Sequence, residues 1–120
     1  MKRGYRIYVA GPMPQGEQIR NVRRAIDVAA RLADAGLAPF VPHLSYLWEL
    51  VAPRTHMEWI AFDLPWIDVS DAVVRLSGPS AGADIEEVHA NEVGVPVFKG
   101  LSDDDLVFAC IQHFEIKTVD

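Results

Sequence analysis

Residues 71–90 read DAVVRLSGPSAGADIEEVHA, and this stretch predicts a strand, a loop and a helix in direct succession. The apolar run from Ala72 to Leu76 predicts a short strand, and the small residues after it predict a loop. The helix that follows carries Glu86 in its first turns, where backbone N–H groups and the positive end of the helix dipole favour an ionised carboxylate. We therefore expect Glu86 to be an anion at neutral pH, fixed near the carboxyl end of a parallel strand.

Strand and helix patterns alternate along the rest of the chain. Apolar and β-branched runs bounded by Gly or Pro predict strands, and apolar residues three or four apart predict helices. The predicted strands are residues 5–10, 37–41, 72–76 and 95–98, and the predicted helices are residues 17–35, 43–51, 83–92 and 102–112. Residues 56–69 are strongly apolar, and Pro65 should bend them or mark a first helical turn. Residues 114–119 fit either a fifth short strand or a tail.

Strands that alternate with helices imply a parallel sheet covered on both faces. We therefore expect an α/β fold, a doubly wound, flavodoxin-like or Rossmann-like three-layer domain with a four- to five-stranded parallel sheet. The length of 120 residues indicates a single domain over residues 1–120. Ligands of such sheets bind beyond the carboxyl ends of the strands, where this chain places Gly11, Met13, His43 and the loop 77–82.

The composition limits the partners and the compartment. The net charge of −6 argues against a nucleic acid polymer as a partner. The single cysteine excludes an internal disulfide and fits a reducing cytosol. No apolar run approaches the roughly 20 residues of a membrane span, and the N-terminus lacks the apolar stretch of a signal peptide. We expect a cytoplasmic protein with no membrane partner.

Two carboxylates are candidates for glycosidic chemistry. Retaining glycosyl transfer needs one carboxylate that attacks the anomeric carbon and a second group that moves a proton. Glu86 suits the nucleophile, because the helix end favours its charge. Asp63 lies among aromatic and aliphatic residues, where desolvation should raise the pKa of its carboxyl group toward acid–base duty. The structural alternatives are a solvated helix acid for Glu86 and a surface carboxylate or helix cap for Asp63.

Several short motifs, taken in their order and spacing, resemble one enzyme family. They are Ile7-Tyr8-Val9-Ala10-Gly11, Asp63-Leu64 followed eight residues later by Asp71-Ala72-Val73-Val74, Ser80-x-Gly82-x-x-x-Glu86 with Ala90, and Gly94-Val95-Pro96-Val97. Together they span most of residues 5–98 and resemble the nucleoside 2-deoxyribosyltransferase superfamily, in particular its 2'-deoxynucleoside 5'-monophosphate N-glycosidases. The resemblance implies an enzyme that breaks the bond between a base and a (deoxy)ribose without a cofactor.

The resemblance also implies a role for individual residues. Glu86 matches the nucleophile that forms a glycosyl-enzyme ester, and Asp63 matches the acid that assists the leaving base. Tyr8 matches a tyrosine of the first strand that contacts the sugar or orients the nucleophile. Ser80 matches a position that is Asp in the transferases of free nucleosides and Ser in the 5'-monophosphate hydrolases. Because an Asp would repel a phosphate, Ser80 favours a 5'-monophosphate, whether or not it is also a helix N-cap.

Further candidates for substrate contacts lie in the loops and at the start of the same helix. They are Gly11, Met13, His43, Ser80, Gly82 and Asp84. Ser80 and Gly82 would hold the 5' group of the substrate. His43 fits either the base pocket or a polar loop, and Met13 fits either a base contact or an apolar filler. Asp84 fits a sugar or base contact or an acid that stabilises the helix start.

Other classes of protein were weighed against this enzyme. The four histidines and the single cysteine lack the spacing of metal ligands, so no metal site is expected. Neither a G-x-G-x-x-G motif nor a P-loop follows the first strand, and no cofactor is expected. A binding or signalling module, including a flavin-binding one, stays open. So does an inactive relative that binds nucleotides, although Asp63 and Glu86 are both present.

The expected partners are a small-molecule nucleotide or nucleoside and further copies of the same chain. Residues 56–69 are too hydrophobic for a helix with one buried face, which indicates a subunit interface. The resemblance also implies a homo-oligomer, a dimer or a larger assembly. The sequence leaves open the base, the choice between ribose and deoxyribose, and the choice between hydrolysis and base exchange.

Overall fold

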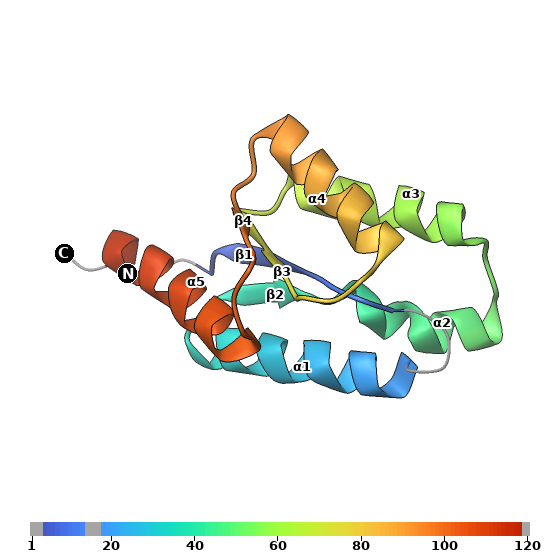
Figure 1. Ribbon diagram of the computed structural model, residues 1–120, viewed down its shortest axis with the longest axis horizontal. Helices are drawn as coiled ribbons and strands as arrows, with labels where there is room; N and C mark the ends of the chain where they lie inside the picture. The colour runs from blue at the N-terminus through green and yellow to red at the C-terminus, as the bar shows by residue number, and fades with distance from the viewer. Residues whose placement is uncertain (1–3, 14–17, 119–120) are drawn as a thin grey trace.

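Four parallel strands form one sheet with helices on both of its faces, in a computed structural model that describes residues 4–13 and 18–118 (Figure 1). The strands are β1 (Arg6–Ala10), β2 (Ala38–Phe40), β3 (Ala72–Arg75) and β4 (Val97–Phe98), in the order β2-β1-β3-β4. The helices are α1 (Gln18–Asp34), α2 (Ser45–Val51), α3 (His56–Asp68), α4 (Ala81–Val93) and α5 (Asp103–Thr118), and a 3₁₀ helix, η1, spans Pro42–Leu44. The predicted α/β class and its parallel sheet are confirmed.

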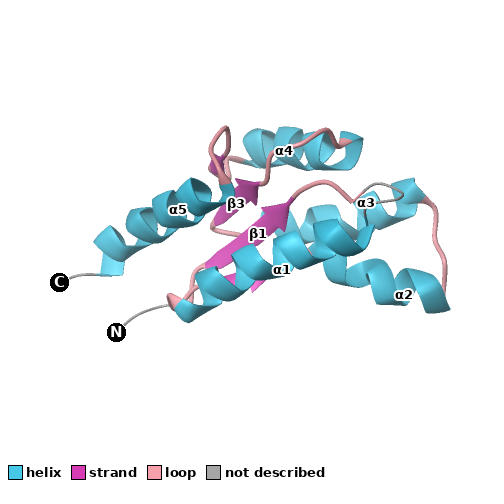
Figure 2. Ribbon diagram, turned by 60° about the horizontal axis from the view of Figure 1, so that its bottom comes forward, coloured by secondary structure: helices cyan, strands magenta, loops and turns pink. Residues whose placement is uncertain are grey.

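The register places β1 and β3 at the centre of the sheet, where both run in the same direction (Figure 2). Tyr8 lies opposite Val73 of β3 and Phe40 of β2. Both central strands are almost entirely buried, and such strands read as continuous apolar runs because helices cover both faces. The predicted strands therefore have the right positions, although β2 and β4 are shorter than the apolar runs that contain them.

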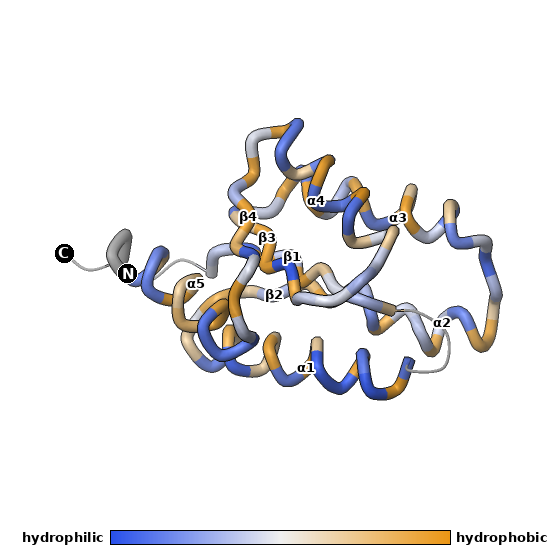
Figure 3. The backbone as a smooth tube through the Cα atoms, in the orientation of Figure 1, coloured by the Kyte–Doolittle hydropathy of each residue, from blue (hydrophilic) through white to orange (hydrophobic). Residues whose placement is uncertain are grey.

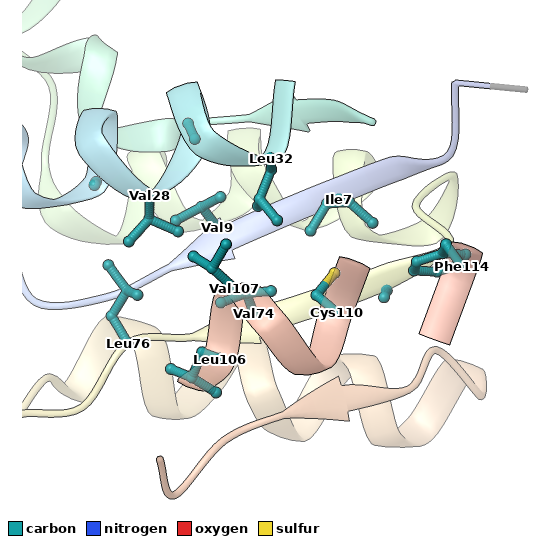
Figure 4. Close-up of a cluster of buried hydrophobic side chains, with 13 residues drawn as sticks. Ile7, Val9, Val28, Leu32, Val74, Leu76, Leu106, Val107, Cys110 and Phe114 are labelled. Carbon is teal, nitrogen blue, oxygen red and sulfur yellow. The ribbon is translucent and has the colours of Figure 1, made fainter. Parts of the chain in front are cut away.

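One hydrophobic cluster packs α1 and α5 against the first face of the sheet (Figure 4). It joins Ile7, Val9 and Val74 of the strands to Val28 and Leu32 of α1. The helix residues that complete it are Leu106, Val107, Cys110 and Phe114 of α5. On α1 the apolar segments face the sheet and the polar ones turn away from it, as the amphipathic pattern predicts (Figure 3).

The second cluster packs α3 and α4 against the opposite face, and this layer carries the candidate site. Tyr8 and Val73 extend from the strands toward Ile67 of α3 and toward Ala83 and Ala90 of α4. The Tyr8 side chain is completely buried. Because side chains alternate along a strand, Tyr8 must face this layer while Ile7 and Val9 face the other.

One expectation about the helices is wrong, and for Pro65 one of the two alternatives is excluded. Residues 114–118 form neither a strand nor a tail, because α5 continues to Thr118. Phe114 continues the buried helical stripe of Leu106 and Cys110, and its ring stacks on Tyr5 at a centroid distance of 4.5 Å. Pro65 lies inside α3 rather than in its first turn, because the helix begins at a capping box formed by Thr55 and Glu58.

The apolar surface of α2 and α3 is only partly covered within one chain. Trp48 and Trp66 are 42% and 45% exposed, so they are not the core residues that tryptophans usually are. Trp48 packs edge-on against Trp59 and Phe62, which joins α2 to α3. No described helix is both long and apolar enough to pass through a bilayer.

Gly11 is expected to be required for stability, because β1 and β3 approach closely where they end. A Cβ atom at Gly11 would lie 3.0 Å from the Cβ of the buried Leu76, whereas one at Gly4 would lie 3.8 Å from the Cβ of Ala38. Gly11→Ala should therefore lower the free energy of unfolding by about 1 to 3 kcal/mol. Gly4→Ala is the matched control and should change it little. Chemical denaturation of both variants measures the difference, and equal stability of the two would contradict the close approach.

Candidate active site

The hydroxyl group of Tyr8 donates a hydrogen bond to Oε2 of Glu86, and this contact is the centre of the candidate site. Tyr8 comes from β1 and Glu86 from α4, and both side chains are buried, with Glu86 only 6% exposed. The Tyr8 ring stacks on Phe40 of β2 at 5.6 Å, and Phe40 in turn stacks on Trp66 of α3 at 5.2 Å. The sheet and the aromatic rings therefore fix the hydroxyl group that holds the carboxyl group of Glu86.

Asp63 brings a second carboxyl group to the same layer from α3. It is 8% exposed, and its Oδ1 atom has no hydrogen-bond partner. Its negative charge acts on both Tyr8 and Glu86. A contact between His89 of α4 and Asp68 of α3, at 2.6 Å, helps to hold the two helices together. The structure thus brings Tyr8, Asp63 and Glu86 together, as the sequence predicts.

Burial controls the protonation of this group. It raises the pKa of Asp63 to about 7, as the apolar sequence around Asp63 predicts. Burial also raises the pKa of Glu86 to about 7, with a further contribution from the charge of Asp63, against the opposing effects of the Tyr8 hydrogen bond and of Arg75. The pKa of Tyr8 is raised far above its usual value, first by burial and then by the two carboxylates, so Tyr8 stays a neutral donor.

The pKa of Glu86 therefore lies above the value that its place near a helix start predicts, and its carboxyl group is only partly ionised at neutral pH. Glu86 is the sixth residue of α4, beyond the first turn, where the helix dipole is weak. The loss of water around its carboxyl group outweighs the stabilisation of the charged form. Because burial raises the pKa of both carboxyl groups to about 7, one can be ionised near neutral pH while the other keeps its proton. A site with one carboxylate and one carboxylic acid can supply both a nucleophile and a proton donor.

Ser80 and Gly82 lie at the start of α4. Ser80 is the N-cap, and its side-chain oxygen accepts a hydrogen bond from the backbone N–H of Ala83 at 3.1 Å. A Cβ atom at Gly82 would lie 3.3 Å from Cε1 of His56, so this glycine permits the close approach of α4 to the start of α3. The capping role of Ser80 is confirmed, and contact of either residue with a substrate stays a prediction.

His43 and Gly11 meet at the loop that follows β1. The Nε2 atom of His43 lies 3.2 Å from the carbonyl oxygen of Pro12, while its Nδ1 atom has no hydrogen-bond partner. Burial lowers the pKa of His43, so the ring is neutral. His43 is a buried histidine, and a role in binding the base stays a prediction. Met13 is half-buried at the end of the described part of this loop, and residues 14–17 lie outside the described residues.

Asp84 is largely exposed and forms an ion pair with Arg75 at 3.0 Å. Its carboxylate therefore has a protein partner, which favours the interpretation that it stabilises the start of α4. Arg75 was missed as a site residue, although one arginine at the end of an otherwise apolar strand was a visible signal. Arg24 was missed as well. It binds Asp103 through two contacts of 2.7 Å and the carbonyl oxygen of Ser77 at 2.7 Å, and the polar face of its helix gave no sign of this.

No group of three or more His, Cys, Asp or Glu residues within the described part of the chain is placed to hold a metal ion. The chemistry that the site offers is that of its own side chains. Glu86 can attack as a carboxylate, Asp63 can give and take a proton, and Tyr8 can orient Glu86 through its hydrogen bond. This is the set of groups that double displacement at a glycosidic carbon requires.

Comparison with solved structures finds an enzyme of the same fold. A 2-deoxyribosyltransferase from the psychrotolerant bacterium Bacillus psychrosaccharolyticus aligns with a TM-score of 0.53 and 28% sequence identity, over 77% of this chain and 69% of that chain. No protein-family model matches the chain, and no curated protein matches it. The neighbour supports the superfamily that the sequence motifs resemble, and with it a nucleoside-processing enzyme of this fold.

The buried carboxyl groups should make the protein less stable as the pH rises toward neutral. Their pKa values are about 7 in the folded protein against ordinary values of 3.8 for Asp63 and 4.5 for Glu86, so the folded state binds protons more tightly. Their contribution to stability is fully present below the ordinary values and is lost as the pH rises to about 7. Asp63→Asn lacks this ionisation. As the pH rises from acid to neutral, its free energy of unfolding should therefore increase relative to that of the wild type.

Denaturant unfolding across that pH range measures this difference. Glu92→Gln, which changes an exposed acid near the end of the same helix as Glu86, is the matched control and should follow the wild type at every pH. Parallel stability curves for the wild type and Asp63→Asn would mean that Asp63 is not buried in the way described.

Proposed function

We propose that this protein cleaves the bond between base and sugar in a (deoxy)nucleoside 5'-monophosphate, through a glycosyl ester on Glu86. The observation that carries the proposal is the buried pair of carboxyl groups, Glu86 and Asp63, with the Tyr8 hydroxyl group bound to Glu86. Their pKa values of about 7 allow one to be charged while the other keeps its proton. The 2-deoxyribosyltransferase neighbour supports the same class of reaction.

The first step exchanges one bond at C1' of the sugar for another. The Glu86 carboxylate attacks C1' and forms an ester bond as the bond from C1' to the base nitrogen breaks. Asp63 gives its proton to the departing base, which leaves as a neutral molecule. Tyr8 donates its hydrogen bond to Glu86 and keeps the attacking oxygen in place.

The second step releases the sugar and restores the enzyme. Asp63, now a carboxylate, takes a proton from a water molecule that attacks C1', and the ester bond to Glu86 breaks. Asp63 is again protonated and Glu86 is again a carboxylate, so the protons balance over the cycle. In the alternative, base exchange, a second base attacks in place of water. The neighbour, a transferase, favours this alternative, whereas Ser80 favours the hydrolase.

The 5' group of the substrate is assigned to the start of α4. Ser80 offers a hydroxyl group there, and Gly82 lies two residues farther along the chain, in the first turn of α4. Gly11, Met13 and His43 are assigned to the base side of the site. Asp84 is placed with the helix start rather than with the substrate, because Arg75 already binds its carboxylate.

We also propose that the protein is a homo-oligomer and that it is cytoplasmic. The exposed apolar side chains of α2 and α3 offer a surface for a second copy of the chain, and Trp48 and Trp66 lie on it. Sedimentation of the purified protein tests this part, and a monomer at micromolar concentration would contradict it. A module that binds nucleotides without turnover is the remaining alternative.

The substrate screen is the direct test of the reaction. The protein is incubated with each nucleoside and deoxynucleoside 5'-monophosphate and with the matching nucleosides, with and without a second base, and free base is separated by chromatography. We expect base release from a monophosphate, and a loss of about a thousandfold or more in Glu86→Gln, because the nucleophile is gone. Glu92→Gln is the control and should keep full activity.

Each outcome of the screen has one meaning. Base release without an acceptor establishes the hydrolase, and exchange only with an acceptor base establishes the transferase. Equal rates for the wild type and Glu86→Gln would reject Glu86 as the nucleophile. No release from any compound would reject the standard substrates and favour the binding module.

The rate should depend on pH with a single maximum near neutral. Glu86 must be charged to attack, so kcat/KM should fall as the pH drops below about 7. Asp63 must be protonated to assist the base, so kcat/KM should also fall as the pH rises above about 7. Asp63→Asn should lose roughly 100-fold in rate and should lose the fall on the alkaline side. Asp34→Asn, an exposed acid at the end of α1, should keep both limbs, and an unchanged alkaline limb in Asp63→Asn would reject the acid role.

A further inference from the structure

Arg75 is a buried arginine at the carboxyl end of β3, opposite Ala10 of β1. It is only 8% exposed, although it ends a strand that is otherwise apolar. Burying a guanidinium group costs several kcal/mol unless every donor finds a partner, so its position calls for a specific role. The sequence motifs and the proposed reaction assign it none.

The guanidinium group of Arg75 joins the loop after β3 to the start of α4. On the loop side it donates to the carbonyl oxygen of Leu76 and, at 3.1 Å, to that of Gly78. On the helix side it donates to Oδ1 of Asp84 at 3.0 Å, and its Nε atom lies 3.8 Å from Oε1 of Glu87. In the sequence, Ser80 lies between the loop residues and the helix residues that Arg75 contacts. The planar guanidinium group therefore fixes the chain before and after Ser80.

In the sequence of α4, Glu86 lies between Asp84 and Glu87, the two acids that contact Arg75. The groups that act on Glu86 from other elements are Tyr8 of β1, Asp63 of α3 and Arg75 of β3. Farther out, His56 lies beside Gly82 at the start of α3, and Lys99, after β4, binds Glu87. The charge of Arg75 lowers the pKa of Glu86, which opposes the effects of burial and of Asp63.

We propose that Arg75 is a positioning residue for this site: its fork fixes the loop 76–80 and the first turns of α4, and it holds a positive charge against the part of α4 that carries Glu86. The consequence for the rate rests on the proposed function. The order of the loop and the effect of the charge on Glu86 do not rest on it, because each can be measured on the protein without turnover. The fork and the charge are also separable, since Lys retains the charge of Arg but not its planar set of donors.

The charge is tested by titrating Glu86 directly. In protein labelled with ¹³C-glutamate, the side-chain carboxyl signal of Glu86 is assigned by its absence in Glu86→Gln and followed against pH by NMR. Arg75→Gln should move the midpoint upward, because removal of a nearby positive charge favours the neutral acid. Arg75→Lys should stay near the wild type. Lys99→Gln, which removes an exposed cation bound to Glu87, is the matched control and should cause no shift.

The fork is tested by amide hydrogen exchange of the peptide that contains residues 76–80. Arg75→Lys should speed exchange in this loop at least severalfold while the strands stay protected, because the carbonyl oxygens of Leu76 and Gly78 lose their donors. If Arg75→Gln does not fold, hydrogen exchange in Arg75→Lys still tests whether Arg75 fixes the loop. An unmoved Glu86 midpoint in folded Arg75→Gln, or a loop as protected in Arg75→Lys as in the wild type, overturns the proposal. Neither result depends on whether the protein releases a base, so the proposed function is judged separately.

Discussion

The burial of the Glu86 carboxyl group against the Tyr8 hydroxyl group is the constraint on which the rest of the structure depends. A buried carboxylate is tolerated only when the groups around it are fixed, because a poorly matched donor does not repay the loss of water. The central position of β1 between β2 and β3 fixes Tyr8, and the packing of α4 against the sheet fixes Glu86. The second acid, Asp63, lies in the same layer, and burial raises the pKa of both carboxyl groups to about 7.

This arrangement explains how one small site can serve both steps of a double displacement. The reaction needs a carboxylate and a carboxylic acid at the same moment. The acid must then act as a base in the second step. In the proposed reaction, two acids with pKa values of about 7 would exchange these roles at neutral pH, because protonation or ionisation of either one costs little free energy. Tyr8 remains a donor throughout, because its own pKa is raised well above the working range.

The strands and most helices follow from the sequence, because apolar periodicity and Gly or Pro boundaries are local signals. That Tyr8, Asp63 and Glu86 lie close together was also predicted, because motifs around them resemble those of a known superfamily, and their roles in a reaction stay a prediction. The protonation of Glu86 does not follow, because it depends on how much water the packed helices exclude, and the helix position alone suggested the opposite. The length of α5 was missed because the aromatic and β-branched residues near its end suit a strand as well as a helix.

The residues that the sequence failed to indicate are those whose role depends on contacts between distant segments. Arg24 of α1 reaches Ser77 and Asp103, and Arg75 of β3 reaches Asp84 and Glu87. The sequence around each arginine does not indicate these partners. One charge at the end of the apolar strand β3 did indicate that Arg75 is unusual. The role of Asp84 was left open between a substrate contact and a helix-stabilising acid for the same reason, because its ion pair with Arg75 forms only when β3 and α4 are packed together.

The most direct test of the central claim is to look for the glycosyl ester on Glu86 itself. The protein is mixed with a substrate that it turns over, quenched in acid within one turnover and digested, and the peptide that carries Glu86 is examined by mass spectrometry. We expect an adduct of the (deoxy)ribose 5-phosphate on Glu86 that appears before the bulk of the base is released and is absent in Glu86→Gln. Base release at full rate with no adduct on that peptide, or with the adduct on another residue, would contradict it.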